Sequence, residues 1–183
     1  MGVCRFEGGG MRIPLIWIAG AFVFGNFYFM VQQKETLLRD GQTVYLALTP
    51  VDPRSLLQGD YMALDYAITN QFDKRWQSDS TKTKLPTSVT MVIQLNGQNE
   101  GQFVRLHEGE AIAQDERLLK FHHKCWHTVI GPDSYFFPEG TGSSFEHAAF
   151  GELKIASDGT PLLLALCDKN HQRLIAKTSP TTK

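Results

Sequence analysis

This chain of 183 residues has no strong excess of charge of either sign, and it contains few cysteines. Lysine and arginine number 18 against 19 aspartate and glutamate residues, which gives a formal net charge of −1. The basic residues are scattered singly, without the stripe that a phosphate backbone requires, so the sequence favours no nucleic-acid partner. There is no internal repeat and no low-complexity tract beyond the polar end at residues 177–183, which we expect to be a disordered tail.

The three cysteines, Cys4, Cys125 and Cys167, are too few for a scaffold held together by disulfides. Cys125 and Cys167 could pair if their strands are neighbours. The favoured interpretation is that both are free and half-buried on strands, because free cysteine behaves as a small hydrophobic residue. The sequence predicts no cofactor.

One long apolar run stands out near the N-terminus. Residues 13–31 carry no charge, and as a helix rising about 1.5 Å per residue they would cover roughly 28 Å, close to the thickness of a bilayer's hydrocarbon core. Trp17 and Tyr28 lie toward its two ends, where interfacial aromatic residues are common. The pattern predicts a transmembrane helix at 13–31, followed by a polar helical continuation that ends near Gly41.

Gly20, Gly25 and Asn26 would give this helix a face for pairing with another helix, because small residues permit close approach and an amide can hydrogen-bond across it. The alternative is that Asn26 simply meets water or lipid headgroups. Two other interpretations of the whole segment are less favoured. One is a cleaved signal peptide, since residues 19–21 have the small-x-small pattern. The other is a buried helix of a soluble protein.

The basic residues that flank the apolar run are balanced on its two sides, so they do not indicate how the helix is oriented in the membrane. The orientation is therefore inferred from the order and size of the segments on either side of it. A short leading segment before a large domain is typical of an uncleaved signal anchor with its N-terminus in the cytoplasm. The expected organisation is as follows: a cytoplasmic tail at 1–12, the transmembrane helix at 13–31, a juxtamembrane linker at 32–41, an extracytoplasmic β-rich domain at 42–176 and the disordered tail at 177–183.

After residue 41 the apolar period changes from helical to two, which is the period of strands. The predicted strands are 44–48, 61–68, 89–95, 103–107, 118–128, 135–137, 151–155 and 162–167. Ser157-Asp158-Gly159-Thr160 is a strong hairpin signal between the last two, and a short helix is indicated only around 70–78. Many short strands favour a mainly β fold, an antiparallel β-sandwich or a partly open β-barrel.

Two segments resemble a known family. Gly59-Asp60-Tyr61-Met62-Ala63-Leu64-Asp65-Tyr66 fits every fixed position of the signature GDYxxLxY, for which a family of bacterial membrane-anchored proteins is named. The second segment is similar to that family's FFxEG and YExAxYGExxV stretch, with phenylalanine at 145 and 150 where tyrosine is expected. Its matching positions are Phe136, Phe137, Glu139, Gly140, Glu146, Gly151 and Glu152.

What the resemblance implies is modest. It covers most of residues 42–176 and implies an uncharacterised extracytoplasmic domain, anchored in the bacterial inner membrane and often encoded beside multi-spanning membrane proteins. It brings no assigned reaction and no catalytic residues. The five fixed signature positions, Gly59, Asp60, Tyr61, Leu64 and Tyr66, are therefore candidate binding residues only.

Three sets of residues could carry chemistry. Ser55, shortly before a Gly-Asp turn, loosely resembles the nucleophile region of membrane-anchored signal peptidases, but no lysine stands in an apolar strand after that turn to act as its base. His123, Cys125 and His127 would share one face of a strand and could contribute to a zinc or copper site, although side chains on one straight strand converge poorly. The third set, Asp60 with Glu139, Glu146 and Glu152, offers carboxylates for acid–base work.

The simpler interpretation of each set is structural: turn residues, a polar strand edge and carboxylates that cap backbone amides. The aromatic residues 61, 66, 136 and 137 are more simply core than a binding patch. The leading hypothesis is therefore a non-enzymatic accessory subunit that docks onto a multi-spanning membrane protein and contacts the lipid bilayer. A serine hydrolase at Ser55, or metal handling through His123, Cys125 and His127, is the alternative.

Overall fold

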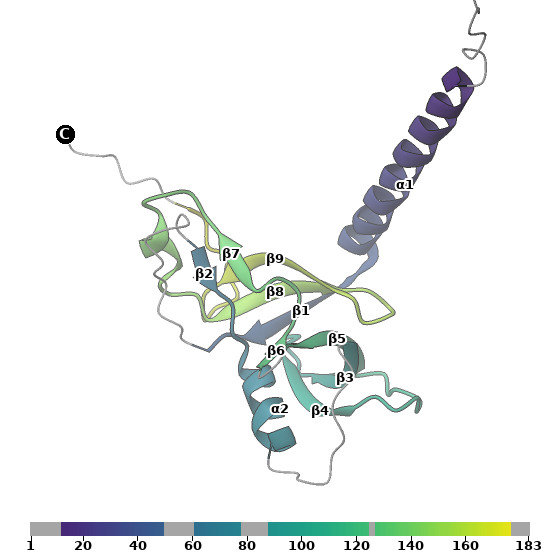
Figure 1. Cartoon of the computed structure of the whole chain (residues 1–183). Helices are drawn as coiled ribbons and strands as arrows, with labels where there is room; N and C mark the ends of the chain where they lie inside the picture. The colour runs from purple at the N-terminus through teal and green to yellow at the C-terminus, as the bar shows by residue number, and fades with distance from the viewer. Residues whose placement is uncertain (1–11, 50–60, 78–87, 125–126, 177–183) are drawn as a thin grey trace, which may run out of the picture. The chain divides into compact units, whose positions relative to one another are not determined.

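The computed structural model describes residues 12–49, 61–77, 88–124 and 127–176 (Figure 1). The chain divides into two compact units, Met1–Arg39 and Asp40–Lys183. The described part of the first unit is helical. The second unit holds every described strand and the short helix α2 (Ala67–Gln77).

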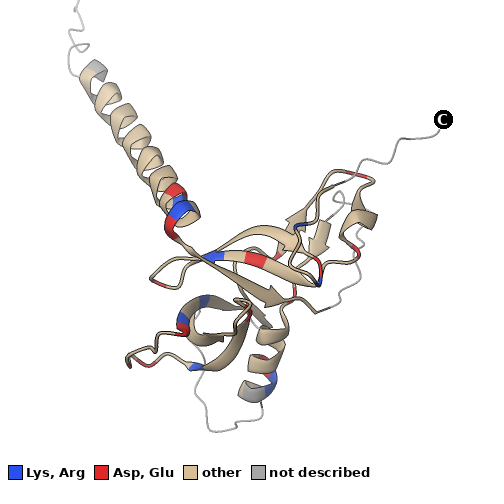
Figure 2. Cartoon of the chain, turned by 180° about the vertical axis from the view of Figure 1, so that it is seen from behind, with Lys and Arg blue, Asp and Glu red and all other residues tan. Residues whose placement is uncertain are grey.

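Helix α1 (Arg12–Asp40) is continuous, so the predicted helix and its end near Gly41 are confirmed. Between Ile16 and Met30 its large apolar side chains are more than half exposed, with Ile16 at 69% and Met30 at 59%. Figure 2 shows that the charged residues coloured on α1 lie in its C-terminal part, and residues 13–31 carry no charge. The helix therefore presents a long apolar surface followed by a short charged end.

No helix in the described part of the chain is both long and apolar enough to cross a bilayer. The prediction of a transmembrane helix at 13–31 is therefore not supported. The polar Asn26 interrupts the apolar run.

The described strands form three antiparallel sheets, which confirms a mainly β fold. The sheet orders are β1-β8-β9, β4-β3-β5-β6 and β2-β7. The strands are β1 (Gln42–Ala47), β2 (Tyr61–Ala63), β3 (Ser88–Leu95), β4 (Gly101–Leu106), β5 (Glu116–Lys124), β6 (His127–Val129), β7 (Ser134–Phe136), β8 (Phe150–Ile155) and β9 (Pro161–Cys167), with a short 3₁₀ helix η1 (Gly142–Phe145) between β7 and β8.

The strand predicted at 61–68 is wrong in its second half, because β2 ends at Ala63 and α2 begins at Ala67. Polar side chains around Asp65 turn the chain there. The Asp65 carboxylate accepts a hydrogen bond from Asn70 Nδ2 (3.1 Å), and the Thr69 hydroxyl donates to the Tyr66 carbonyl (2.7 Å). Side-chain bonds of this kind favour the start of a helix over a continuing ladder.

The two larger sheets and α2 share one core. It draws buried side chains from β1 and β8, from β3 and β5 and from α2: Val44, Leu46, Leu153, Ile155, Met91, Ile93, Leu119, Phe121, Ile68 and Phe72. The sheets are also joined at their edges, where the Tyr45 amide donates to the Asn99 carbonyl (2.9 Å). A second join is the tip of the β8–β9 hairpin, whose Gly159 carbonyl accepts from the Lys120 amide (2.8 Å).

Candidate functional site

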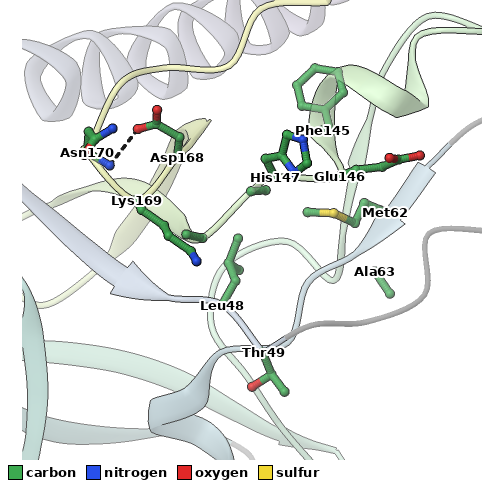
Figure 3. Close-up of a pocket in the computed structure, with 12 residues that line it drawn as sticks. Leu48, Thr49, Met62, Ala63, Phe145, Glu146, His147, Asp168, Lys169 and Asn170 are labelled. Carbon is green, nitrogen blue, oxygen red and sulfur yellow. Dashed lines mark hydrogen bonds between the residues drawn. The ribbon is translucent and has the colours of Figure 1, made fainter.

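A cavity of about 720 Å³ opens beside β2 in the second unit (Figure 3). Segments far apart in the sequence form its walls: the end of β1, strand β2, the chain after η1 and the turn after β9. Its lining residues are Leu48, Thr49, Met62, Ala63, Phe145, Glu146, His147, Ala148, Ala149, Asp168, Lys169 and Asn170.

Aromatic packing holds the apolar floor of this cavity in place. Phe145 is buried and stacks on Phe137 with ring centroids 4.9 Å apart, and Tyr135 lies against Phe145 at 5.6 Å. Met62 and Leu166 complete this second, smaller core. The floor is therefore built largely from the two segments that resemble the family pattern, together with the end of β9.

The rim of the cavity is polar. The Asp168 carboxylate accepts hydrogen bonds from the amides of Gln172 (2.9 Å) and Asn170 (2.8 Å), which lower the pKa of Asp168 and fix the turn. The side chains of Glu146, His147 and Lys169 are exposed, and within the described chain they form no hydrogen bond or ion pair. In Figure 3 the Lys169 side chain reaches across the opening toward Leu48.

The described signature residues occupy three environments. Tyr61 lies opposite Phe136 in the β2–β7 ribbon, with ring centroids 6.0 Å apart, and Phe136 is 72% exposed. Leu64 packs at the edge of both cores. Tyr66 is buried, and Gly59 and Asp60 lie outside the described residues. The expectation of a plain aromatic core holds for Tyr66 and Phe137 but not for Phe136.

The two family-like segments meet at Tyr66 and Gly151. A side chain added at Gly151 would place its Cβ 3.0 Å from the Tyr66 ring and 3.2 Å from its hydroxyl oxygen. Glycine is therefore the residue that lets β8 approach this ring. The last tyrosine of the first segment and the glycine of the second are explained by one packing contact.

Glu152 has a structural partner that sequence reasoning missed. Arg173, beyond β9, donates two hydrogen bonds to the Glu152 carboxylate, from Nε at 2.6 Å and from an amino nitrogen at 2.7 Å. This pairing lowers the pKa of Glu152 despite its burial. Twenty-one residues separate the partners, so the only sequence signal is a lone glutamate within an apolar strand.

Cys167 lies beside this pair. The structure records it as a free, buried cysteine, with its sulfur 3.8 Å from Glu152 Oε2. Burial and the neighbouring carboxylate raise the pKa of the Cys167 thiol to about 11. The thiol is therefore protonated at neutral pH and poorly suited to act as a nucleophile. Cys125, its predicted alternative partner, lies outside the described residues.

The predicted carboxylate set is not brought together as a unit. Glu152 is held by Arg173, Glu146 lies on the cavity rim, and Glu139 is exposed in a turn where Gly140 takes a φ of +76°. Asp60 lies outside the described residues. Of the four, Glu146 is the described carboxylate that faces the cavity region.

The single strand predicted to carry His123, Cys125 and His127 is wrong. β5 ends at Lys124 and β6 begins at His127, and these two residues are partners in the antiparallel β5–β6 ladder. His123 faces the helix, with Nδ1 3.3 Å from the Thr128 hydroxyl and 4.0 Å from Asp73 Oδ1. Within the described residues no group of three potential ligands is placed to hold a metal ion.

Ser55, the candidate nucleophile, lies outside the described residues. The proposed helix-packing positions on α1 are open, since nothing lies within 4 Å of a Cβ added at Gly20 or Gly25. Lys169 and Asn170 are among the cavity residues that sequence reasoning missed, because only the fold brings the turn after β9 to the side of β2.

Comparison with known proteins identifies a family. The family model described as "GDYXXLXY protein" matches residues 23–166, which is most of the chain. No curated protein and no solved structure matches.

Proposed function

We propose that this chain, which belongs to the family of GDYXXLXY proteins, is a non-enzymatic accessory protein of a multi-spanning membrane protein. Helix α1 would attach it to apolar surfaces of that partner and of the surrounding lipid. The β domain would then be held at the bacterial inner membrane, on its periplasmic side. The single observation that carries the proposal is the apolar surface of α1.

That surface surrounds the helix. Residues 27–30 are four consecutive positions with exposed fractions between 59% and 66%. Because successive residues of an α-helix point about 100° apart, four in a row face all sides. A helix that is apolar all round needs apolar cover, and each large side chain gains about 1.5–3 kcal/mol when it is fully buried. Membrane proteins and lipid provide such cover.

One buried polar cluster of the β domain supports a non-enzymatic role. Glu152 and Arg173 satisfy each other, and the Cys167 thiol beside them is kept protonated. The family-like segments meet in a packing contact, between Tyr66 and Gly151, and in the floor of a cavity. These features favour a domain that binds over one that carries out a reaction.

Recovery of a partner from detergent-solubilised membranes tests the proposal. The intact chain, tagged at its C-terminus, should recover a multi-spanning membrane protein. Phe22→Asn combined with Phe24→Asn should reduce that recovery severalfold, because two large side chains on the apolar surface become polar. Gln33→Asn, on the polar part of α1, is the matched control and should leave recovery unchanged. Recovery of the chain alone, whatever the salt concentration, would contradict the proposal.

A further inference from the structure

We propose that His171 and Glu100 form a proton-dependent clamp, which joins the turn after β9 to the β3–β4 hairpin when His171 is charged and loosens this join when His171 is neutral. The inference goes beyond the proposed function and does not depend on α1, because both residues belong to the second unit. It rests on the placement of the imidazole, the backbone around it and the charges that face it.

The His171 imidazole is enclosed by two aromatic rings. Tyr45 of β1 stacks on it, with ring centroids 4.3 Å apart and an interplanar angle of 19°. Phe150, at the start of β8, meets it edge-on at 4.7 Å. The His171 side chain is only 18% exposed. The imidazole is therefore held in one place, so that its ring nitrogen faces a defined neighbour.

That neighbour is Glu100, just before β4. His171 Nε2 lies 3.1 Å from Glu100 Oε1, but in the described structure this buried nitrogen completes no hydrogen bond. A neutral imidazole therefore gains little from the contact, and an unsatisfied buried polar atom costs stability. A charged imidazole is attracted to the carboxylate without the alignment that a hydrogen bond needs. The strength of the contact thus depends on the proton.

Glu100 is held in position for this contact. Its second carboxylate oxygen accepts a hydrogen bond from Asn96 Nδ2 (2.7 Å), and its amide donates to Asn96 Oδ1 (2.9 Å). The Tyr45 amide donates to the carbonyl of Asn99 (2.9 Å), and Tyr45 is bridged to Glu100. Tyr45 is therefore joined to both halves of the clamp, by its backbone to the hairpin and by its ring to His171.

Unusual backbone conformations flank the clamp. Among the described residues, Asn99 (φ +60°) and His171 (φ +59°) are the non-glycine residues with positive φ. This conformation favours glycine, and other residues that are kept in it concentrate at functional and switch regions. A histidine in the turn after β9 supplies a ring and a charge that glycine lacks. The clamp therefore gives a reason for a histidine at this position.

Most groups around His171 keep one charge state near neutral pH. Burial raises the pKa values of Tyr45 and Cys167, which keeps both neutral, and Arg173 neutralises Glu152. Histidine is the side chain whose charge ordinarily changes between pH 5 and 8, so a change in this range is assigned to His171. The titratable side chains on the elements packed against His171 are Glu100, Tyr45, Glu152, Cys167, Asp168, Lys169 and Arg173.

The clamp tightens as the pH falls. Glu100 attracts charged His171, and so does Asp168, whose pKa is lowered chiefly by the Gln172 amide and further by the charge of His171. Enclosure by two rings opposes the charge, although an aromatic face also attracts a cation. The stabilisation is therefore present at low pH and is lost as the pH rises and His171 releases its proton.

The same turn forms part of the cavity wall. Asp168, Lys169 and Asn170 line the cavity and directly precede His171 (Figure 3). The pairing of Arg173 with Glu152 ties the end of this turn to β8, within its own sheet. The clamp is the contact that ties it to the other sheet. The charge of His171 would therefore set how firmly this wall of the cavity is held.

Amide hydrogen exchange of the full-length chain in detergent tests the clamp. After correction for intrinsic exchange, the Tyr45 amide should be protected about threefold more strongly at pH 5.5 than at pH 8, the size of effect expected of a partly exposed ion pair. Carboxylates ordinarily stay ionised in this range. The Lys120 amide, which donates to Gly159 at the other join between the sheets, is the internal reference and should not change.

Three variants locate the effect. Glu100→Gln keeps the size of the side chain but removes its charge, and should make the protection of Tyr45 equal at both pH values. His171→Asn should also abolish the pH dependence, because asparagine tolerates positive φ and carries no charge. The double variant should be as independent of pH as either single one. His122→Asn, the same change at an exposed histidine of β5, is the control and should keep the pH dependence of the unaltered chain.

Equal protection of the Tyr45 amide at both pH values in the unaltered chain would overturn the proposal, and so would a pH dependence that survives in Glu100→Gln. A parallel change at Lys120 would also overturn it, because the whole domain would then be responding. Should His171→Asn fail to fold, Glu100→Gln still decides, since it leaves the turn and the rings intact. A negative result leaves the attachment through α1 untouched, since no membrane partner takes part in the experiment.

Discussion

At the scale of single residues, Tyr66 illustrates a signature position that is fixed by shape. Its side chain is buried, and its hydroxyl has no hydrogen-bond partner in the described structure. Burial raises the pKa of Tyr66, so the phenol stays neutral. A buried hydroxyl without a partner costs stability, and the ring that lies across Gly151 is the part that packs.

Tyr66→Phe is therefore expected to leave the free energy of unfolding unchanged or to raise it by up to about 1 kcal/mol, because only an unsatisfied group is removed. Gly151→Ala should lower it by about 1–3 kcal/mol, because the added methyl group meets the ring. Chemical denaturation of both variants measures the difference. A Tyr66→Phe protein clearly less stable than the unaltered chain would show that the hydroxyl has a partner or a function.

Glu152 gives the domain a defined response to acid. Because Arg173 lowers the pKa of Glu152 below its ordinary value of 4.5, the pairing contributes full stability above pH 4.5 and loses it as the pH falls through the folded-state pKa. Arg173 is 59% exposed, so solvent screens the pair. Glu152→Gln should cost about 1–2 kcal/mol near neutral pH and much less at pH 3.

Thermal melts of Glu152→Gln and of the unaltered chain between pH 3 and 7 measure how the difference in stability between them shrinks as the pH falls. Glu139→Gln is the control, since Glu139 is an exposed turn residue, and its melts should follow the unaltered chain at every pH. A Glu152→Gln deficit of constant size across the range would mean that the carboxylate charge is not what stabilises this part of the sheet.

At the scale of elements, the β8–β9 hairpin joins the two larger sheets. Gly159 in its turn has a φ of +87°, and a Cβ added there would lie 3.1 Å from the Leu118 carbonyl carbon. The Lys120 side chain also pairs with Asp158 at 2.7 Å. The turn residues recognised in the sequence therefore do more than reverse the chain, because they also position the tip against β5.

Gly159→Ala should lower the free energy of unfolding by about 1–3 kcal/mol, through the strained φ and the close backbone contact together. Gly97→Ala is the matched control, because nothing lies within 4 Å of its added Cβ, and it should change stability little. Denaturant titrations compare the two. Equal effects of both substitutions would contradict the docking of the hairpin tip.

The elements that the sequence predicts well are those specified locally. The hairpin at 157–160 and the strands around it follow from turn chemistry and alternation, and the long N-terminal helix follows from composition. The end of β2 and the start of α2 depend on hydrogen bonds made by Asp65 and Thr69, which strand periodicity does not reveal. The separation of β5 from β6 was not predicted, because residues 118–128 have the pattern of one strand.

The candidate site was less predictable than the fold, because its parts meet only through tertiary structure. The signature places Met62 and Ala63, but the opposite wall comes from Lys169 and Asn170, more than a hundred residues later. No local pattern distinguishes this turn from any other polar turn. Likewise, the partner of Glu152 follows β9 and could not be chosen among the scattered arginines.

At the scale of the whole molecule, the division into two units separates the hydrophobic core from the apolar helix. The two core clusters draw all their residues from the second unit. Residues 40–183 produced without α1 should therefore unfold in one cooperative transition, with a midpoint within a few degrees of the intact chain in detergent. Circular dichroism melts measure this, and a non-cooperative melt of the shortened chain would show that the domain depends on α1.

Location can be tested on the same pair of chains. If α1 directs the β domain to the periplasmic side of the inner membrane, a reporter enzyme that is active only in the periplasm should be active when fused to the C-terminus of the intact chain. The fusion to residues 40–183 should be silent, because its apolar export segment is gone. A reporter active only in the cytoplasm should give the reverse pattern, which controls for expression. A silent periplasmic reporter and an active cytoplasmic reporter on the intact chain would place the domain in the cytoplasm and remove the proposed periplasmic role.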